Sequence, residues 1–107
     1  MTDHDLVKAL KAIAHPTRFK MVQEVAAAGE LSCGQLGERF HVAQPTISHH
    51  LKLLSEAGVL IIRKVAQHHY ISVNREVVQG LLGSLPVRLA PAGARGAVVK
   101  SRKAARK

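Results

Sequence analysis

Residues 44–54, QPTISHHLKLL, restrict the fold more than any other stretch, because their apolar and polar residues separate when they are placed on a helix. At about 100° per residue, three leucine and isoleucine side chains fall on one narrow stripe that has to be buried: Ile47, Leu51 and Leu54. His49 and Lys52 fall on the opposite side, and His50 lies beside the stripe, where it is expected to pack. We therefore expect a helix from about residue 45 to 57, with a polar face that needs solvent or a partner.

The segments on either side of this helix define its setting. Upstream, Ser32 and Gln35 have the spacing of a capping box and predict the start of a short helix, joined to the next by a tight connection at residues 41–44. Downstream, VLIIRKV (59–65) and YISV (70–73) are short and β-branched, and predict a two-stranded hairpin. Two short helices followed by a hairpin predict a mainly α protein with a small β-hairpin, the winged helix-turn-helix fold.

Three further helices complete the expected order. One covers residues 3–14, and Pro16 suits the first turn of a second, which ends at Gly29. The last follows Asn74 as its N-cap and ends at Leu85, because Pro86 and Pro91 are expected to stop ordered structure. We therefore predict one domain over residues 1–85 and a disordered tail over 86–107.

Charge is distributed unevenly along the 107 residues, whose formal net charge is +9. Residues 86–107 carry seven Lys and Arg and no acid, whereas residues 1–85 carry nine basic residues against seven acids. The tail therefore supplies most of the excess. A strongly basic chain favours a polyanionic partner such as nucleic acid.

Several classes of protein are disfavoured by simpler observations. No apolar run approaches the about 18 residues that a membrane span needs, and the N-terminus MTDHDLVKAL lacks the pattern of a secretory signal. The single cysteine, Cys33, cannot form an internal disulfide. We expect a cytoplasmic protein without a membrane partner. Catalysis is not expected, since Ser48 and His49 are neighbours on a helix and diverge.

The polar face of the 45–57 helix suits the DNA major groove. Its N-terminal half carries short hydrogen-bonding side chains, and Gln can pair with adenine while Ser and Thr contact several base edges. Arg63 and Lys64 on the first strand of the hairpin suit phosphates, or alternatively protect an edge strand from aggregation. The predicted DNA-contacting residues are Gln44, Pro45, Thr46, Ser48, His49, Lys52, Arg63, Lys64 and His68.

Three segments, AHPTRFKMV, LSCGQLGERFHVAQPTISHHLKLLSEAGVL and HHYISVN, together resemble the ArsR family of bacterial winged-helix repressors. The resemblance covers about residues 6–85. It implies a homodimer, paired through the first and last helices, that binds an operator in double-stranded DNA, expected to be an inverted repeat, and represses transcription. It also implies release by an inducer, often a metal ion. The residues expected at the dimer interface are Leu6, Leu10, Val78, Leu81 and Leu82.

This chain departs from the family pattern at two places. Ala43 stands where the family often has a capping serine, so Gln44 or a water is expected to cap the helix instead. Ser32, Gly34 and Gly37 occupy the positions of the three cysteines of the family's arsenic sensors, so we expect no metal site, no cofactor and an unknown inducer. Cys33, between them, is expected to be a small buried hydrophobe with a possible redox role.

Two other functions stay open on the sequence alone. One is an architectural protein whose basic tail coats DNA without sequence preference. The other is a thiol or metal sensor that uses Cys33 with histidines. His68 and His69 are expected at the hairpin turn, where neighbouring residues face opposite sides and cannot easily share a metal.

Overall fold

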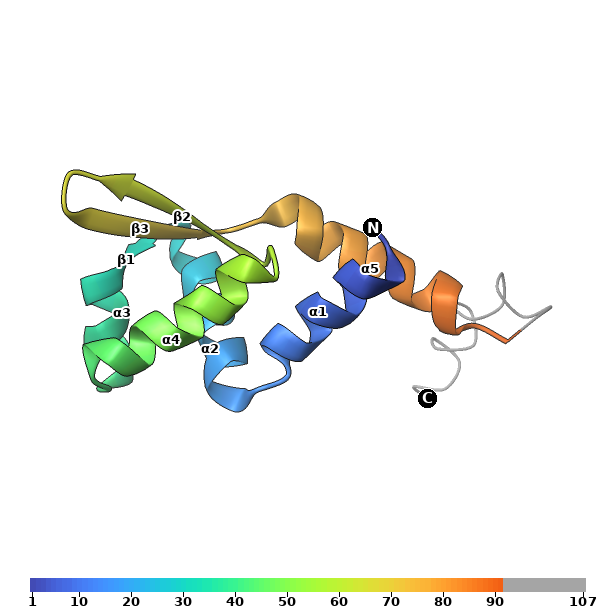
Figure 1. Ribbon diagram of the computed structural model, residues 1–107, viewed down its shortest axis with the longest axis horizontal. Coiled ribbons are helices and arrows are strands. Elements are labelled where there is room, and N and C mark those ends of the chain that lie inside the picture. Colours follow the sequence, from blue (N-terminus) through green and yellow to red (C-terminus); the bar gives the residue numbers. More distant parts are fainter. Residues whose placement is uncertain (92–107) are drawn as a thin grey trace.

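The computed structural model describes residues 1–91, which fold as a helical body with a projecting β-hairpin (Figure 1). The helices are α1 (Asp3–Ile13), α2 (Pro16–Ala28), α3 (Cys33–Phe40), α4 (Gln44–Glu56) and α5 (Arg75–Leu89). The strands are β1 (Leu31–Ser32), β2 (Leu60–Val65) and β3 (His68–Val73). The winged helix-turn-helix prediction is confirmed, with α3 and α4 as the helix pair and β2–β3 as the wing.

The core is aliphatic and draws on nearly every element. The largest fully buried side chains come from α2, α3, α4, β3 and the segment before β2: Met21, Val25, Leu36, Ile47, Leu54, Val59 and Ile71. Burial of such a side chain contributes about 1.5–3 kcal/mol. The three residues of the predicted stripe on α4 all belong to this core, so the opposite side of α4 must face outward.

Local capping explains where the helices begin. Ser32 Oγ accepts from the Gln35 backbone N–H at 3.1 Å, and Gln35 Oε1 accepts from the Ser32 N–H at 2.8 Å, so the predicted capping box is present. Asn74 caps α5 as predicted, through the Val77 N–H at 3.4 Å. Two caps were expected for α4, the Gln44 side chain or a water, and the expectation for Gln44 is wrong. Ala43 is the N-cap and no side chain caps it, while Gln44 lies inside the helix.

The wing belongs to a three-stranded antiparallel sheet of order β1-β3-β2 rather than to a two-stranded hairpin. Leu31 pairs with Ile71 and Ser32 with Tyr70. A two-residue strand carries no alternation that a sequence pattern can detect. The turn between β2 and β3 is formed by Ala66 and Gln67, so His68 and His69 are the first residues of β3 and not turn residues as predicted.

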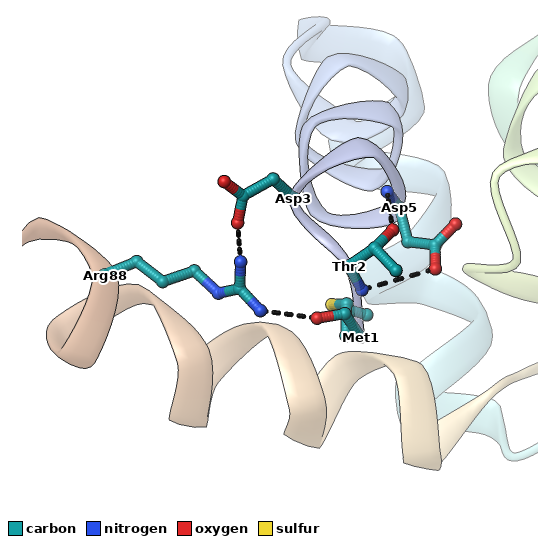
Figure 2. A network of polar contacts seen from close by, with 5 residues as sticks. All are labelled: Met1, Thr2, Asp3, Asp5 and Arg88. Atoms are coloured by element: carbon teal, nitrogen blue, oxygen red, sulfur yellow. Dashed lines mark hydrogen bonds and ion pairs between the residues drawn. The ribbon is translucent and has the colours of Figure 1, made fainter.

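The predicted end of ordered structure at Leu85 is also wrong, because α5 continues through Pro86 to Leu89. Proline inside a helix removes one backbone hydrogen bond, but the final turn is held by contacts with the other end of the chain. Arg88 forms an ion pair with Asp3 and donates a hydrogen bond to the Met1 carbonyl (Figure 2). Residues 92–107 of the predicted tail lie outside the described residues.

These contacts predict a modest stabilising role for Arg88. Arg88→Ala should lower the free energy of unfolding by up to about 1 kcal/mol, since Asp3 is well exposed and exposed ion pairs contribute little more. Arg75→Ala, at the opposite end of the same helix, is the control and should have a smaller effect. Urea denaturation of the three proteins measures both values, and equal stability of Arg88→Ala and wild type would contradict the contact.

Candidate nucleic-acid interface

The outer side of α4 presents every residue predicted there for DNA contact. Ile47, Leu51 and Leu54 are buried, so the helix can rotate little about its axis. The residues left exposed on α4 and predicted to contact DNA are Gln44, Pro45, Thr46, Ser48, His49 and Lys52. Four of them lie within the first five residues of the helix. The N-terminal half of α4 is therefore the half that offers short hydrogen-bonding groups.

The wing adds charge on both faces of the sheet. Arg63 pairs with Tyr70 in the register, and its guanidinium carbon lies 5.0 Å from the Tyr70 ring centre. Arg63 also forms an ion pair with Glu30 at 3.0 Å, so part of its charge is compensated within the protein. Lys64 lies on the opposite face of β2, and over residues 1–91 it forms no ion pair. Of the two cationic side chains predicted to contact DNA, Lys64 is therefore the one whose charge is not compensated by an ion pair within residues 1–91.

A cleft of about 470 Å³ separates the wing turn from the N-terminal ends of α3 and α4. Its walls come from all three segments: Ser32, Cys33, Gly34, Gln35, Glu38, Gln44, Gln67, His68 and His69. His69 pairs with Lys64 in the sheet and was not among the predicted contacts. Direct pairing across the two strands places His69 and Lys64 on one face, and the prediction that His69 is a turn residue missed this register. His68, which was predicted, lies beside Tyr70, with 6.3 Å between ring centres.

His50 has an unusual environment on the inner edge of α4. It is only 9% exposed, its ring centre lies 5.1 Å from that of His15, and its Nδ1 has no hydrogen-bond partner. His15 Nδ1 is already engaged, because it accepts from the Thr17 N–H at 3.1 Å and caps α2. Burial lowers the pKa of His50, and the nearby positive groups of His15, Arg18 and His49 lower it further. The neutral form of His50 is thus the form that fits the fold.

Cys33 is partly buried at the start of α3 rather than fully enclosed. Burial raises the pKa of the thiol, which favours the protonated form. Over residues 1–91, no three His, Cys, Asp or Glu side chains are grouped so that they could hold a metal ion. None of the helices in the same range has the length and apolar character needed to cross a membrane.

Comparison with known proteins identifies the family. The pattern of a helix-turn-helix domain family matches residues 13–63. The transcriptional repressor SdpR of Bacillus subtilis (strain 168) is 38% identical over 69 residues, which are 64% of this chain and 76% of the repressor. An arsenical resistance operon repressor of Staphylococcus xylosus is 30% identical over 87 residues, 81% of this chain and 83% of that protein.

The chain belongs to the ArsR family of helix-turn-helix transcriptional regulators. It is a DNA-binding regulator and not an enzyme. An ArsR-like transcriptional regulator from Rhodococcus sp. RHA1 superimposes with a TM-score of 0.72 at 22% identity, covering 95% of this chain and 89% of that one. At this identity the likeness establishes the fold. The family resemblance found in the sequence is confirmed by the two related repressors.

The environment of His50 predicts a specific pH dependence of stability. Its pKa in the folded protein lies below the ordinary value of 6.5, so its contribution to stability is complete above that value and is lost as the pH falls through the folded pKa. His50→Leu replaces the titrating imidazole with an apolar side chain. The stability of wild type should therefore fall more steeply than that of His50→Leu between pH 7.5 and 5.

The measurement is urea denaturation across this pH range without DNA. His68→Ala, which removes an exposed histidine of the wing, is the control and should keep the wild-type slope. Parallel pH profiles for wild type and His50→Leu would show that His50 is not the group responsible.

Proposed function

We propose that this protein is a homodimeric repressor that inserts the N-terminal half of α4 into the major groove of an inverted-repeat operator. The exposed polar residues at the start of α4 carry this proposal, because the second helix of a helix-turn-helix reads bases through its N-terminal residues. Residues 1–85, which include most of α5, are proposed to form the DNA-binding and dimerisation domain. The proposed location is the cytoplasm.

The wing is proposed to contact the DNA backbone beside the groove. Lys64 and His68 suit phosphate contact, and His69, which lines the cleft together with His68, is proposed to join them. Arg63 is proposed to contribute less to DNA binding than the sequence suggested, because its guanidinium already forms an ion pair with Glu30. Contacts of this kind fix the position of the protein on the duplex, whereas base choice rests on α4.

The dimer is proposed to form through α1 and α5, and within the protomer the start of α1 lies against α5 (Figure 2). The interface residues expected from the sequence need correction, because Leu6 and Leu81 are buried in the protomer's own core. Leu10 and Val78 are partly buried, and Leu82 is 64% exposed. The exposed apolar residues that sequence reasoning missed on these two helices are Val7, Val87 and Leu89. Burial of these exposed apolar side chains against a second copy would remove them from water.

A metal inducer does not fit the residues on α3. Ser32 and Gln35 are used in the capping box, and Gly34 and Gly37 have no side chain that could coordinate a metal. Soft metals bound by ArsR-type sites need several thiolates, and only Cys33 is available there. We therefore propose a regulator whose DNA binding does not depend on a metal at α3.

Two substitutions test the groove assignment. Gln44→Ala and Ser48→Ala should each weaken binding to a specifically bound duplex by about 1–3 kcal/mol, because each removes a base contact. Binding to random duplex should change little. Gln23→Ala, an exposed glutamine of α2, is the control and should leave both affinities unchanged. Wild-type affinity of both α4 variants in fluorescence anisotropy would contradict the assignment.

Exposed leucine on α5 provides the test of assembly. Sedimentation velocity of wild type should show a dimer, and Leu82→Lys should give a monomer, since a buried lysine at an apolar interface costs several kcal/mol. Ile61→Lys changes an apolar side chain of β2 that is 49% exposed, and should leave the dimer intact. A monomeric wild type, or a dimer unaffected by Leu82→Lys, would exclude this interface.

The basic segment beyond the described residues is proposed to add affinity for phosphates without base choice. Truncation after Pro91 keeps α5 and removes six basic residues: Arg95, Lys100, Arg102, Lys103, Arg106 and Lys107. If three of these engage, the plot of log affinity against log salt should become shallower by about three units per protomer. Replacement of the same six residues by glutamine should reproduce the effect. An unchanged slope would show that they do not contact DNA.

A further inference from the structure

The side chain of Gln44 is held against one face of α3. The thiol of Cys33 donates a hydrogen bond to Gln44 Oε1, with 3.5 Å between sulfur and oxygen. Gly37 lies one turn further along α3, and a Cβ placed on it would be 3.5 Å from Gln44 Nε2. Cys33 and Gly37 are four residues apart and therefore on the same face of the helix. The carboxamide thus lies across α3 with its oxygen towards the thiol and its nitrogen over the glycine.

The chemistry of this contact determines which end of the carboxamide points where. A thiol is a weak donor and a weak acceptor, and here its S–H donates to the amide oxygen and not to the amide nitrogen, which is itself a donor. Burial raises the pKa of Cys33, and the thiol keeps the proton that it donates at neutral pH. The carbonyl oxygen of Gln44 retains a second lone pair, and its Nε2 retains both hydrogens for another partner.

Recognition of adenine by glutamine needs this arrangement of donor and acceptor. The amide oxygen accepts from the N6 amine of adenine while the amide nitrogen donates to N7. A freely rotating glutamine can present the two groups in either order, and it loses rotamer freedom when it binds. A carboxamide already oriented on α3 avoids part of that loss.

We propose that Cys33 is a positioning residue that determines base specificity by orienting the carboxamide of Gln44 before DNA is bound. The inference rests on the proposed function, in which Gln44 reads a base. It assigns to Cys33 a role distinct from metal binding and from oxidation. Cys33 also packs against the core, but packing alone would affect stability and not the choice of base.

The size of the effect follows from the cost of ordering one long side chain. That cost is about 0.5–1.5 kcal/mol, which corresponds to about a two- to tenfold change in affinity. Cys33→Ala should therefore reduce discrimination by this factor at the single base pair that Gln44 reads. Other base pairs of the same site, and random duplex, should be unaffected.

The test is a double-mutant cycle measured on a specifically bound duplex and on its single base-pair substitutions. Gln44→Ala first identifies the base pair concerned, and Cys33→Ala should relax the preference at that pair. Cys33→Ala added to Gln44→Ala should have no further effect. Cys33→Ser, which keeps a donor of similar size, should retain most of the preference. Equal loss on all duplexes, or the same loss in the Gln44→Ala background, would overturn the proposal.

A second measurement on the free full-length protein separates this inference from the proposed function. The NMR order parameter of the Gln44 side-chain amide should fall in Cys33→Ala and stay close to wild type in Cys33→Ser. An unchanged order parameter in Cys33→Ala would overturn the positioning role whatever the DNA results. If the order parameter falls but Gln44→Ala alters no base preference, the failure lies in the groove assignment, and the specificity role falls with it.

Discussion

Burial of the apolar stripe on α4 is the constraint on which the rest of the structure depends. Ile47 and Leu54 are fully buried and Leu51 nearly so, and they hold the helix between α1, α3 and β2. Because residues on a helix are related by fixed rotation, this burial places Ser48, His49 and Lys52 on the outside. The surface available for DNA is thus a direct consequence of the core. His50 lies at the boundary between the buried and exposed sides of α4. Its Nδ1 is buried without a hydrogen-bond partner, which is an unfavourable consequence of this orientation of the helix.

The rotation between neighbouring helix positions also separates the core residues of α5 from the residues that are proposed to contact a second copy. Leu6 and Leu81 complete the core of the protomer, whereas Leu82, next to Leu81 on α5, points away from it. The helix α4 and the wing lie towards one end of the molecule in Figure 1, and α5, which carries the exposed Leu82, lies towards the other. A dimer through α1 and α5 would leave both recognition helices accessible. The contacts of Arg88 with Asp3 and Met1 stabilise this end of the molecule, because they hold the last turn of α5 against the start of α1 (Figure 2).

Sequence patterns predicted the features that follow from periodicity and capping. The stripe of α4, the capping box at Ser32 and the cap at Asn74 all have short, local signals, and all three are present. Features that depend on distant partners were missed. Leu31 and Ser32 form a strand only because β3 is available for pairing, and α5 passes Pro86 with its last turn held by the N-terminus. The contact between Cys33 and Gln44 joins two helices, and no local pattern contains it.

Selection of bound duplexes from a random DNA pool tests the central claim most directly. A dimer that presents two copies of α4 should enrich an inverted repeat whose half-sites are centred about one helical turn, or a multiple of it, apart. Each half-site should contain positions at which one base pair dominates. Recovery of duplexes without a common sequence would contradict base reading by α4, and enrichment of a single site without symmetry would contradict the proposed dimer.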